Sequence, residues 1–319
     1  NPDLTLHDVS ILDAADRPAL AFSRVEAILS WWSVPSAKLK LRLLRIVEPT
    51  LNLRRDPQGR FFVAGLPLNG NEGGGDVSDW ILAQRKIRIQ DATLVWEDEL
   101  RQAPVLRLES LNFGLDSFGR HHRFGLTAIP PGELASRIDV RGDFRGADLD
   151  LLEDWAGTAF AEIDYIDLAA WRKWIDYPVA LPHGRGALRS WVGFSHGALR
   201  EITADFSLSD VSMRLAREIP SLDLTSMSGR IVANLSKSGF VVKGRGIELE
   251  TRPVPRRKGA PEPGIRIEPT DFHVEWQPQE GGQEGAQEVA GSASATRLDL
   301  AALGRLAARL PLAGPPRRM

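Results

Sequence analysis

The chain of 319 residues contains no cysteine, which excludes disulfide bonds, thiolate metal sites and cysteine nucleophiles. It has no excess of charge of either sign, because 40 lysines and arginines stand against 42 aspartates and glutamates. Such a balance is not typical of a general nucleic-acid binder, so we expect no nucleic-acid partner. Long hydrophobic runs are missing as well. The apolar runs are only a few residues long, whereas a membrane-spanning helix needs roughly 20.

The two ends of the chain show no targeting segment. No charged region followed by an apolar one comes after Asn1, so we expect no signal peptide in this sequence. A strand pattern is already under way at Leu4, and the chain ends on PPRRM. We therefore expect a piece of a longer polypeptide, and the pattern leaves open an anchor in the missing part.

The segment LKLRLLRIVEPTLNLRRDPQGRFFVAGL, residues 39–66, is patterned for strands. Apolar side chains recur at every second position, which predicts strands with one apolar face. The DPQG sequence at 56–59 suits a tight turn, because proline fixes φ and glycine accepts a positive φ. The alternating apolar positions are Leu39, Leu41, Leu43, Leu51, Leu53, Phe61 and Val63.

Period-two patterns continue along most of the chain and predict a mainly β fold. A meander of half-buried strands is expected over residues 86–140, and further strands over 188–276. The third expected helix would carry Leu300, Leu303 and Leu306 on one side. The helices are expected near residues 77–85, 167–176 and 299–310. We divide the chain into segments 1–150 and 151–319 of one continuous, elongated unit.

A six-residue outline, named the kink motif below, recurs five times. It consists of an apolar residue, a gap, an acidic or small polar residue, a gap, a hydroxyl or amide residue, and a second apolar residue. Its polar side chains can bond to nearby backbone in competition with the sheet ladder, which favours bends or bulges. We therefore interpret it as a strand-bend-strand unit. The copies are LHDVSI at 6–11, IVEPTL at 46–51, IQDATL at 89–94, LESLNF at 108–113 and LSDVSM at 208–213.

Residues suited to catalysis are few. His121 and His122 are adjacent, and strand neighbours point to opposite faces, so we interpret them as solvated strand residues rather than metal ligands. Asp91, Glu97 and Asp98 have arginines nearby in the sequence and are interpreted as surface ion pairs. The GFSHG segment lacks the strand-to-helix setting of a nucleophile elbow and predicts a hairpin turn. We expect no enzyme activity, no cofactor and no metal.

A family resemblance runs along the whole chain. EPTLNLRRDPQGRFFVAGL at 48–66, DWIL at 79–82 and IQDATLVWED at 89–98 resemble, in this order, the N-terminal part of the YhdP-type AsmA-like envelope proteins, relatives of TamB. These motifs are structural rather than catalytic. Later segments that resemble the same family are HHRF at 121–124, DVRGDF at 139–144, DLAAW at 167–171 and GRGALR at 184–189.

The resemblance implies both a fold and a function. The implied fold is mainly β, a long twisted antiparallel sheet curled into an elongated apolar groove, with a few short helices. Family members are anchored in the inner membrane, reach across the periplasm of Gram-negative bacteria, and are implicated in carrying phospholipid towards the outer membrane. The implied location is the periplasm. The implied partners are phospholipid acyl chains, the inner membrane through the missing anchor, and outer-membrane or periplasmic proteins.

On this hypothesis one face of the strands lines the groove, while Lys40, Arg42, Arg54 and Arg88 face water. The same alternation would also line the sealed core of a β-sandwich or barrel, so the pattern leaves both arrangements open. Two other functions also stay open: an envelope scaffold or outer-membrane protein assembly factor that transports nothing, and a carbohydrate-active β-helix protein. The residues expected to line the groove are Leu39, Leu41, Leu43, Leu51, Leu53, Phe61, Val63, Ile87, Ile89, Leu94 and Trp96.

Overall fold

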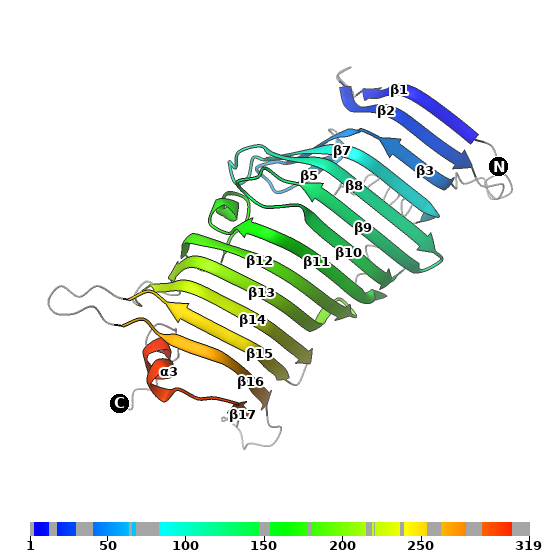
Figure 1. Ribbon diagram of the computed structural model, residues 1–319. Coiled ribbons are helices and arrows are strands. Elements are labelled where there is room, and N and C mark those ends of the chain that lie inside the picture. The colour runs from blue at the N-terminus through cyan, green and yellow to red at the C-terminus, as the bar shows by residue number, and fades with distance from the viewer. Residues whose placement is uncertain are drawn as a thin grey trace. The chain divides into compact units, whose positions relative to one another are not determined.

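A computed structural model shows that most described residues lie in β-strands (Figure 1). The chain divides into two compact units. Unit 1 comprises Asn1–Ile163 and Val192–Leu199, and unit 2 comprises Asp164–Trp191 and Arg200–Met319. The prediction of a mainly β chain built on twisted sheets is confirmed. The structure describes residues 3–12, 18–29, 41–63, 66–67, 83–146, 154–177, 180–214, 219, 221–236, 239–253, 263–278 and 289–307.

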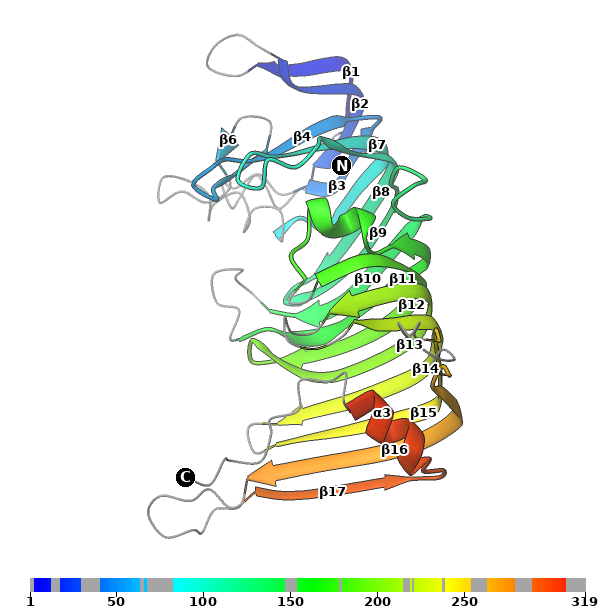
Figure 2. The same ribbon diagram turned by 90° about the vertical axis from the view of Figure 1, so that its left-hand side faces the viewer.

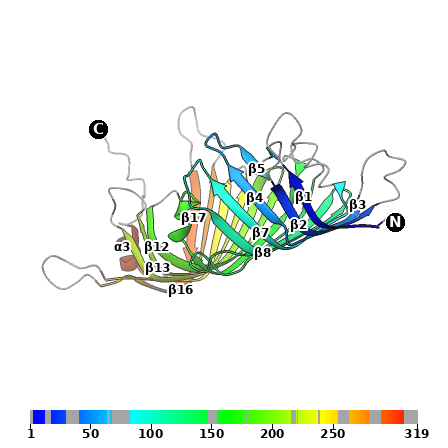
Figure 3. The same cartoon turned by 90° about the horizontal axis from the view of Figure 1, so that it is seen from above.

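Unit 1 is a mixed sheet rather than a wholly antiparallel one. Strands β1 to β3 pair antiparallel in chain order, and so do β7 to β11. Strands β3 and β4 both run parallel to β7, and Figure 3 shows β4 beside β7. The strands are β1 (Asp3–Leu12), β2 (Pro18–Leu29), β3 (Leu41–Val47), β4 (Thr50–Arg55), β5 (Phe61–Val63), β6 (Leu66–Pro67), β7 (Lys86–Asp98), β8 (Leu106–Phe118), β9 (His121–Ile129), β10 (Ile138–Arg145) and β11 (Ala156–Asp167).

The parallel pairing has a local cause at the start of β7. The backbone N–H of Arg85 donates to the carbonyl of Leu41 (3.3 Å), and the N–H of Leu41 donates to the Gln84 side-chain oxygen (2.7 Å). The two strands therefore begin side by side and run in the same direction. Strand β7 then continues past the end of β3 and pairs with β4, so β3 and β4 form one interrupted strand rather than two neighbours.

Unit 2 is antiparallel, with β13 to β17 paired in chain order. The predicted hairpin turn between β12 and β13, which belongs to unit 1, is confirmed, with both His196 (φ 54°) and Gly197 (φ 67°) in the left-handed region that two-residue hairpins favour. The elements are the 3₁₀ helix η2 (Ala170–Lys173), β12 (Ala180–Ser195), β13 (Ala198–Arg214), β14 (Leu222–Ser236), β15 (Gly239–Thr251), β16 (Arg266–Pro278), β17 (Val289–Ala295) and the helix α3 (Leu300–Ala307).

The helices are shorter than predicted. Asp167 accepts a bond from the N–H of Ala170 (2.8 Å) at the start of the 167–176 segment, but only the four residues of η2 are helical and their N-cap is Ala169. Helix α3 is capped by Asp299, which accepts from the N–H of Ala302 (2.9 Å). Its predicted apolar stripe is incompletely buried, because Leu300 is 72% exposed whereas Leu306 packs on the core. Of the expected helix at 77–85, only Ala83–Arg85 lie within the described residues.

The kink motif forms a bend in all five copies, as predicted. Its third residue has a left-handed φ in each case: Asp8 50°, Glu48 51°, Asp91 51°, Ser110 46° and Asp210 55°. Non-glycine residues rarely adopt this conformation, and Asp and Asn do so more readily than most. The pairing register shifts beside Asp91 and Ser110, as expected for β-bulges.

The bend explains the spacing of the motif. Its two apolar residues are five positions apart, an odd number, so an unbroken strand would place them on opposite faces. The left-handed residue shifts the alternation by one and returns both to the same face. Ile89 and Leu94 accordingly pack on one buried cluster, Ala92, Leu111 and Ala128, as do Leu108 and Phe113. In unit 2, Leu208 and Met213 both pack on the cluster of Leu181, Val211, Leu222, Leu224 and Leu249.

Candidate functional site

The main candidate for a functional site in unit 1 is a sheet face lined with apolar side chains, called the apolar face. Register aligns Ile46 with Ile89, Ile89 with Phe113, and Phe113 with Leu126. Side chains directly opposite each other in a ladder share a face. The apolar face therefore crosses β3, β7, β8 and β9 without interruption. Its members are Leu44, Ile46, Leu51, Leu53, Phe61, Val63, Ile87, Ile89, Leu94, Trp96, Leu108, Phe113, Leu115, Phe124, Leu126, Val140 and Phe144.

The other face of the same strands, the polar face, carries cross-strand ion pairs. Arg88 binds Asp116 through both carboxylate oxygens (2.7 and 2.8 Å). Asp143 accepts from His121 and Arg123, and these two bonds lower its pKa. The prediction that Arg88 faces away from the apolar side is confirmed. The sheet is therefore two-sided, with one face suited to water and the other to hydrocarbon.

Many members of the apolar face are only half-buried. Ile46, Ile89, Phe113, Phe124 and Leu126 are neither fully buried nor fully exposed. In the sealed core of a β-sandwich such central side chains would pack against a second sheet and lose their contact with water. Within the part of unit 1 that the structure describes, the face is therefore an accessible surface.

The predicted lining residues fall into three groups. The ladder puts Leu51, Leu53, Phe61, Val63, Ile87, Ile89, Leu94 and Trp96 on the apolar face. Leu43 lies on the polar face, because the register places it in line with Ile28 on β2, away from Ile46 and Ile89. Leu41 is buried at the start of β3, with an exposed fraction of 6%. Leu39 and Lys40 lie outside the described residues.

The ambiguity at β3 comes from two consecutive leucines, Leu43 and Leu44. Either could continue an alternating apolar pattern, and the choice decides which face the whole strand presents. Leu44 pairs with Ile87 and Ile46 with Ile89, so the apolar phase is Leu44 and Ile46 rather than Leu43. The register with β2 shifts between Ile28 and Leu29, so Leu41 and Arg42 lie beyond a bulge and do not follow this phase. The kink motif at 46–51 indicates the correct phase, because its two apolar residues, Ile46 and Leu51, lie on the same face.

An aromatic cluster extends the apolar face across β9 to β11. Phe144 packs on Phe124 and Trp155, with ring centroids 5.6 and 4.9 Å apart. Beside it lies a pocket of about 370 Å³, called the aromatic pocket. Glycine makes the arrangement possible, because a Cβ on Gly142 would approach the Phe124 ring to 2.2 Å. The pocket is lined by Phe124, Phe144, Trp155, Ala159, Phe194 and Gly197.

The two adjacent histidines lie on opposite faces, as predicted, but only His121 is solvated. His122 is 2% exposed and stacks on Trp155, with centroids 5.8 Å apart. Its Nδ1 lies 3.0 Å from the Ser117 hydroxyl and its Nε2 lies 3.3 Å from the carbonyl of Gly146. Burial lowers the pKa of His122, so the neutral form is favoured in the folded protein.

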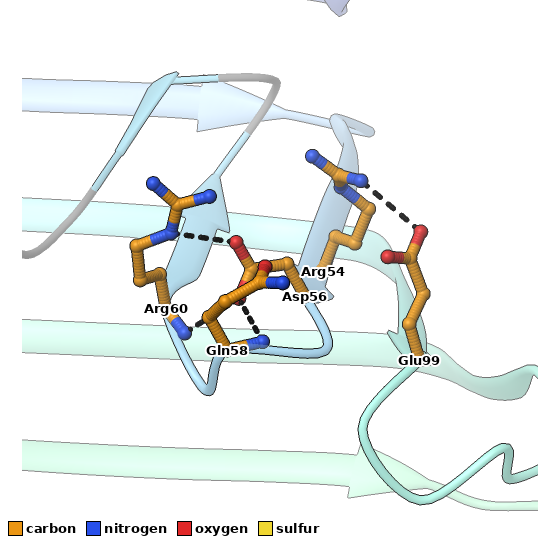
Figure 4. Close-up of polar contacts among 5 residues, drawn as sticks. All are labelled: Arg54, Asp56, Gln58, Arg60 and Glu99. Carbon is orange, nitrogen blue, oxygen red and sulfur yellow. Dashed lines mark hydrogen bonds and ion pairs between the residues drawn. The ribbon is translucent and has the colours of Figure 1, made fainter.

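The β4–β5 turn, predicted from DPQG, is held by Asp56 (Figure 4). Its carboxylate accepts bonds from the N–H groups of Gln58 (3.0 Å) and Arg60 (2.9 Å) and from Arg60 Nε (2.7 Å). Burial alone would raise the pKa of Asp56, but the bonds from Arg60 outweigh it and lower the pKa. Arg54, on the polar face, binds Glu99 (3.1 Å). The turn therefore fixes Phe61 and Val63 beside Leu53.

Of the three acidic residues singled out in the sequence, Asp98 forms ion pairs, including one with the nearby Arg101 (Nε to Oδ2, 3.8 Å), but it is buried rather than on the surface. Asp91 and Glu97 form no ion pair with another described residue. Asp98 is 3% exposed and binds Arg55 (Arg55 Nε to Oδ1, 2.9 Å). Arg88 binds Asp116 rather than a carboxylate of its own strand. Within the described ranges, no three His, Asp or Glu side chains gather in a metal-binding arrangement. None of the helices described there has both the length and the hydropathy to span a bilayer.

Unit 2 has an apolar face of its own. Register aligns Ala233 with Val242 and Val242 with Val274, and Phe240 stacks on Trp276 with centroids 5.6 Å apart. The opposite face carries Asp205, whose pKa is lowered by its hydrogen bonds from Arg230. Figure 2 shows α3 beside the strands of unit 2, where Leu306 packs on the buried cluster.

Comparison with known proteins identifies one family. The family model described as YhdP protein matches residues 1–316, nearly the whole chain. No curated protein and no solved structure matches it.

Proposed function

The chain belongs to the YhdP family, and from this membership we propose that its apolar faces shield phospholipid acyl chains as lipid moves between the inner and outer membranes. The membership supports a role in the bacterial cell envelope. A location in the periplasm and a membrane anchor outside this sequence are parts of the same proposal. The proposed ligand is the acyl chain, and the reaction is transfer without covalent chemistry.

The observation that carries the proposal is the half-buried apolar face of unit 1. Hydrocarbon-like side chains run in register across β3, β7, β8 and β9, while the cross-strand ion pair of Arg88 with Asp116 lies on the other face. Exposed contiguous apolar surface of this kind is unusual on a soluble protein and marks a contact surface for apolar partners.

The energetic need for such a face is large. Each CH₂ group moved from a lipid environment into water costs about 0.8 kcal/mol. Two acyl chains of about 16 carbons therefore face a penalty on the order of 25 kcal/mol. An apolar face removes most of this penalty by covering the chains, while the charged head group stays in water. No nucleophile, metal or cofactor is needed.

Neighbouring residues on β9 provide a matched test. Leu126 belongs to the apolar face and Thr127 to the polar face, and both are half-buried. A photoreactive benzoylphenylalanine is placed at either position in the full-length protein, irradiated in cells, and the adducts are identified by mass spectrometry. We expect phospholipid adducts at Leu126 and at least tenfold fewer at Thr127.

Other outcomes would reject the proposal. Equal lipid adducts at both positions would mean that the two faces do not differ towards lipid. Protein adducts at Leu126 without any lipid would favour a scaffold or assembly factor that transports nothing.

Accessibility can be tested separately, because the chain has no native cysteine. A single Leu126→Cys variant should react with a water-soluble maleimide, whereas Leu111→Cys, at a site 5% exposed, should stay largely unreacted under native conditions. Protection of both positions would indicate a sealed core.

A further inference from the structure

A second pocket, called the cationic pocket, lies on the polar face of unit 1. Its volume is about 580 Å³, larger than the aromatic pocket. The ladder explains its position, because Asp3 pairs with Ile28, Ile28 pairs with Leu43, and Lys86 pairs with Asp116. These side chains share the face opposite to Ile87 and Leu115. The pocket is lined by Asp3, Ile28, Arg42, Leu43, Arg85, Lys86, Asp116 and Phe118.

Positive charge is in excess in this pocket. Arg42, Arg85 and Lys86 stand against Asp3 and Asp116. Both carboxylate oxygens of Asp116 are already bound by Arg88, at 2.7 and 2.8 Å, and Lys86 reaches Asp116 only at 3.7 Å. Most of the negative charge of Asp116 is therefore neutralised from outside the pocket.

Two of the cations are available to a ligand. Within the described part of the chain, no carboxylate binds the guanidinium of Arg42 or Arg85. Arg85 instead lies over the ring of Phe118, 5.6 Å from its centroid. Guanidinium groups match phosphate and carboxylate oxygens in geometry, and stacking on an aromatic ring leaves the N–H edge free to donate.

The floor of the pocket is apolar, and backbone hydrogen bonds between neighbouring segments hold its walls in place. Ile28, Leu43 and Phe118 supply hydrocarbon surface, and Phe118 is 58% exposed. The N–H of Ser117 donates to the carbonyl of Arg85 (3.0 Å), and Arg85 in turn donates to Leu41 (3.3 Å). Arg42 and Lys86 are therefore carried by the paired strands β3 and β7, and backbone hydrogen bonds hold Arg85 directly before β7.

We propose that the cationic pocket binds an anionic amphiphile, namely a phosphate group attached to a short apolar segment, as in an anionic phospholipid. The phosphate would lie between Arg42 and Arg85, and the apolar segment would lie on Phe118, Leu43 and Ile28. Concave sites with an apolar floor and a few charged groups are the usual form of small-ligand sites. The inference is independent of acyl-chain shielding, because it concerns the opposite face.

The test uses the full-length protein and three soluble probes in isothermal titration calorimetry. Dihexanoyl phosphatidylglycerol has both the charge and the apolar segment, inorganic phosphate has only the charge, and dihexanoyl phosphatidylcholine has no net charge. We expect phosphatidylglycerol to bind at least tenfold more tightly than either of the others. Phosphate binding as tightly would indicate a free-phosphate site, and phosphatidylcholine binding as tightly would remove the role of the cations. Absence of phosphatidylglycerol binding would also overturn the inference.

Variants locate the binding. Arg42→Gln and Arg85→Gln should each weaken phosphatidylglycerol binding about tenfold, whereas Arg42→Lys, which keeps the charge, should weaken it less than threefold. Arg107→Gln is the matched control, since Arg107 is exposed on β8 and pairs with Glu109 outside the pocket. Equal binding by Arg42→Gln and the native protein would overturn the assignment. Lipid crosslinking at Leu126 should be unchanged in Arg42→Gln, so the two proposals can fail separately.

Discussion

The buried clusters of the two units differ in what covers them. In unit 1, the residues packed around Ala92, Leu111 and Ala128 all come from strands of the sheet. In unit 2, the cluster around Leu224 is also contacted from outside the strands, by Leu168 and Tyr177 on either side of η2 and by Leu306 of α3. The kink motif contributes to both clusters.

The comparison shows that the strand pattern creates an apolar face but does not decide whether the face is covered. Covering depends on the segments that follow the strands, and in unit 2 the residues flanking η2 and the helix α3 provide it. Within the described residues, unit 1 keeps its face accessible. We therefore expect lipid contact to be strongest on unit 1 and weakest where η2 and α3 pack.

The largest effect is expected when a leucine in each of the two clusters is replaced by alanine and the losses in unfolding free energy are compared. Leu224→Ala in unit 2 should cost about 3–5 kcal/mol, because a covered site cannot collapse around the cavity. Leu111→Ala in unit 1 should cost about 2–3 kcal/mol, since neighbours on the uncovered side can relax. Urea denaturation measures both. Leu199→Ala, at a site 40% exposed, serves as the control with an expected loss below about 1 kcal/mol. Equal losses at Leu111 and Leu224 would mean that both clusters are covered.

The second prediction concerns a contact that occurs in both units, in which an aromatic ring packs directly on a glycine. A Cβ at Gly142 would meet Phe124 at 2.2 Å, and one at Gly244 would meet Phe272 at 2.2 Å. Gly142→Ala and Gly244→Ala should therefore each cost about 1–3 kcal/mol through displaced rings. Gly125→Ala, where the Cβ meets nothing within 4 Å, should be neutral or slightly stabilising. Thermal and urea unfolding compare the three, and a neutral Gly142→Ala would show that the ring moves freely.

The third prediction tests one left-handed residue in each unit, Asp91 of a kink motif and Gly246 outside the motif. Asp91→Val should cost about 1–2 kcal/mol, because a β-branched residue resists the left-handed conformation. Asp91→Gly should change the free energy of unfolding by less than about 0.5 kcal/mol, since glycine accepts it. Gly246 in unit 2, with φ 56° and open space at its Cβ position, should respond to Val as Asp91 does. A tolerated Asp91→Val would mean that the bend is not required.

The smallest effect expected is a pH dependence confined to unit 1. Burial lowers the pKa of His122, and the nearby charge of His121 acts in the same direction. As pH falls from 7 to 5, the unfolded chain therefore takes up the proton before the folded protein does, and stability falls. The difference in urea midpoint between native protein and His122→Gln should shrink or reverse over this range. A difference that stays constant with pH would contradict the assignment.

Much of the fold could be predicted because it depends on local rules. Alternation predicted the strands, and the side chains of Asp and Ser predicted the bends at Asp91 and Ser110. The DPQG turn followed from the φ preferences of proline and glycine. The parallel pairing of β3 with β7 could not be predicted, because it depends on contacts between Leu41 and Gln84, residues 43 positions apart in the sequence.

The site was predicted only in part, for the same reason. The lining residues near Leu51 and Ile89 could be assigned from their own alternation. The aromatic pocket combines Phe124, Phe144, Trp155 and Phe194, which come from separate parts of the chain and meet only through the pairing of strands. His122 illustrates the limit most directly. Alternation with Phe124 and Leu126 places it on the apolar face, but its burial depends on stacking against Trp155, which lies far away in the sequence.

The left-handed residue in each kink also has a consequence for how such a chain can change its length. A single-residue insertion in a strand turns every following side chain to the wrong face, so strands should tolerate insertions only in pairs. A kink adds one residue in the left-handed conformation, and the side chains that follow it return to their original face. Homologous sheets should therefore vary by odd numbers of residues where a bend is gained or lost, and by even numbers everywhere else.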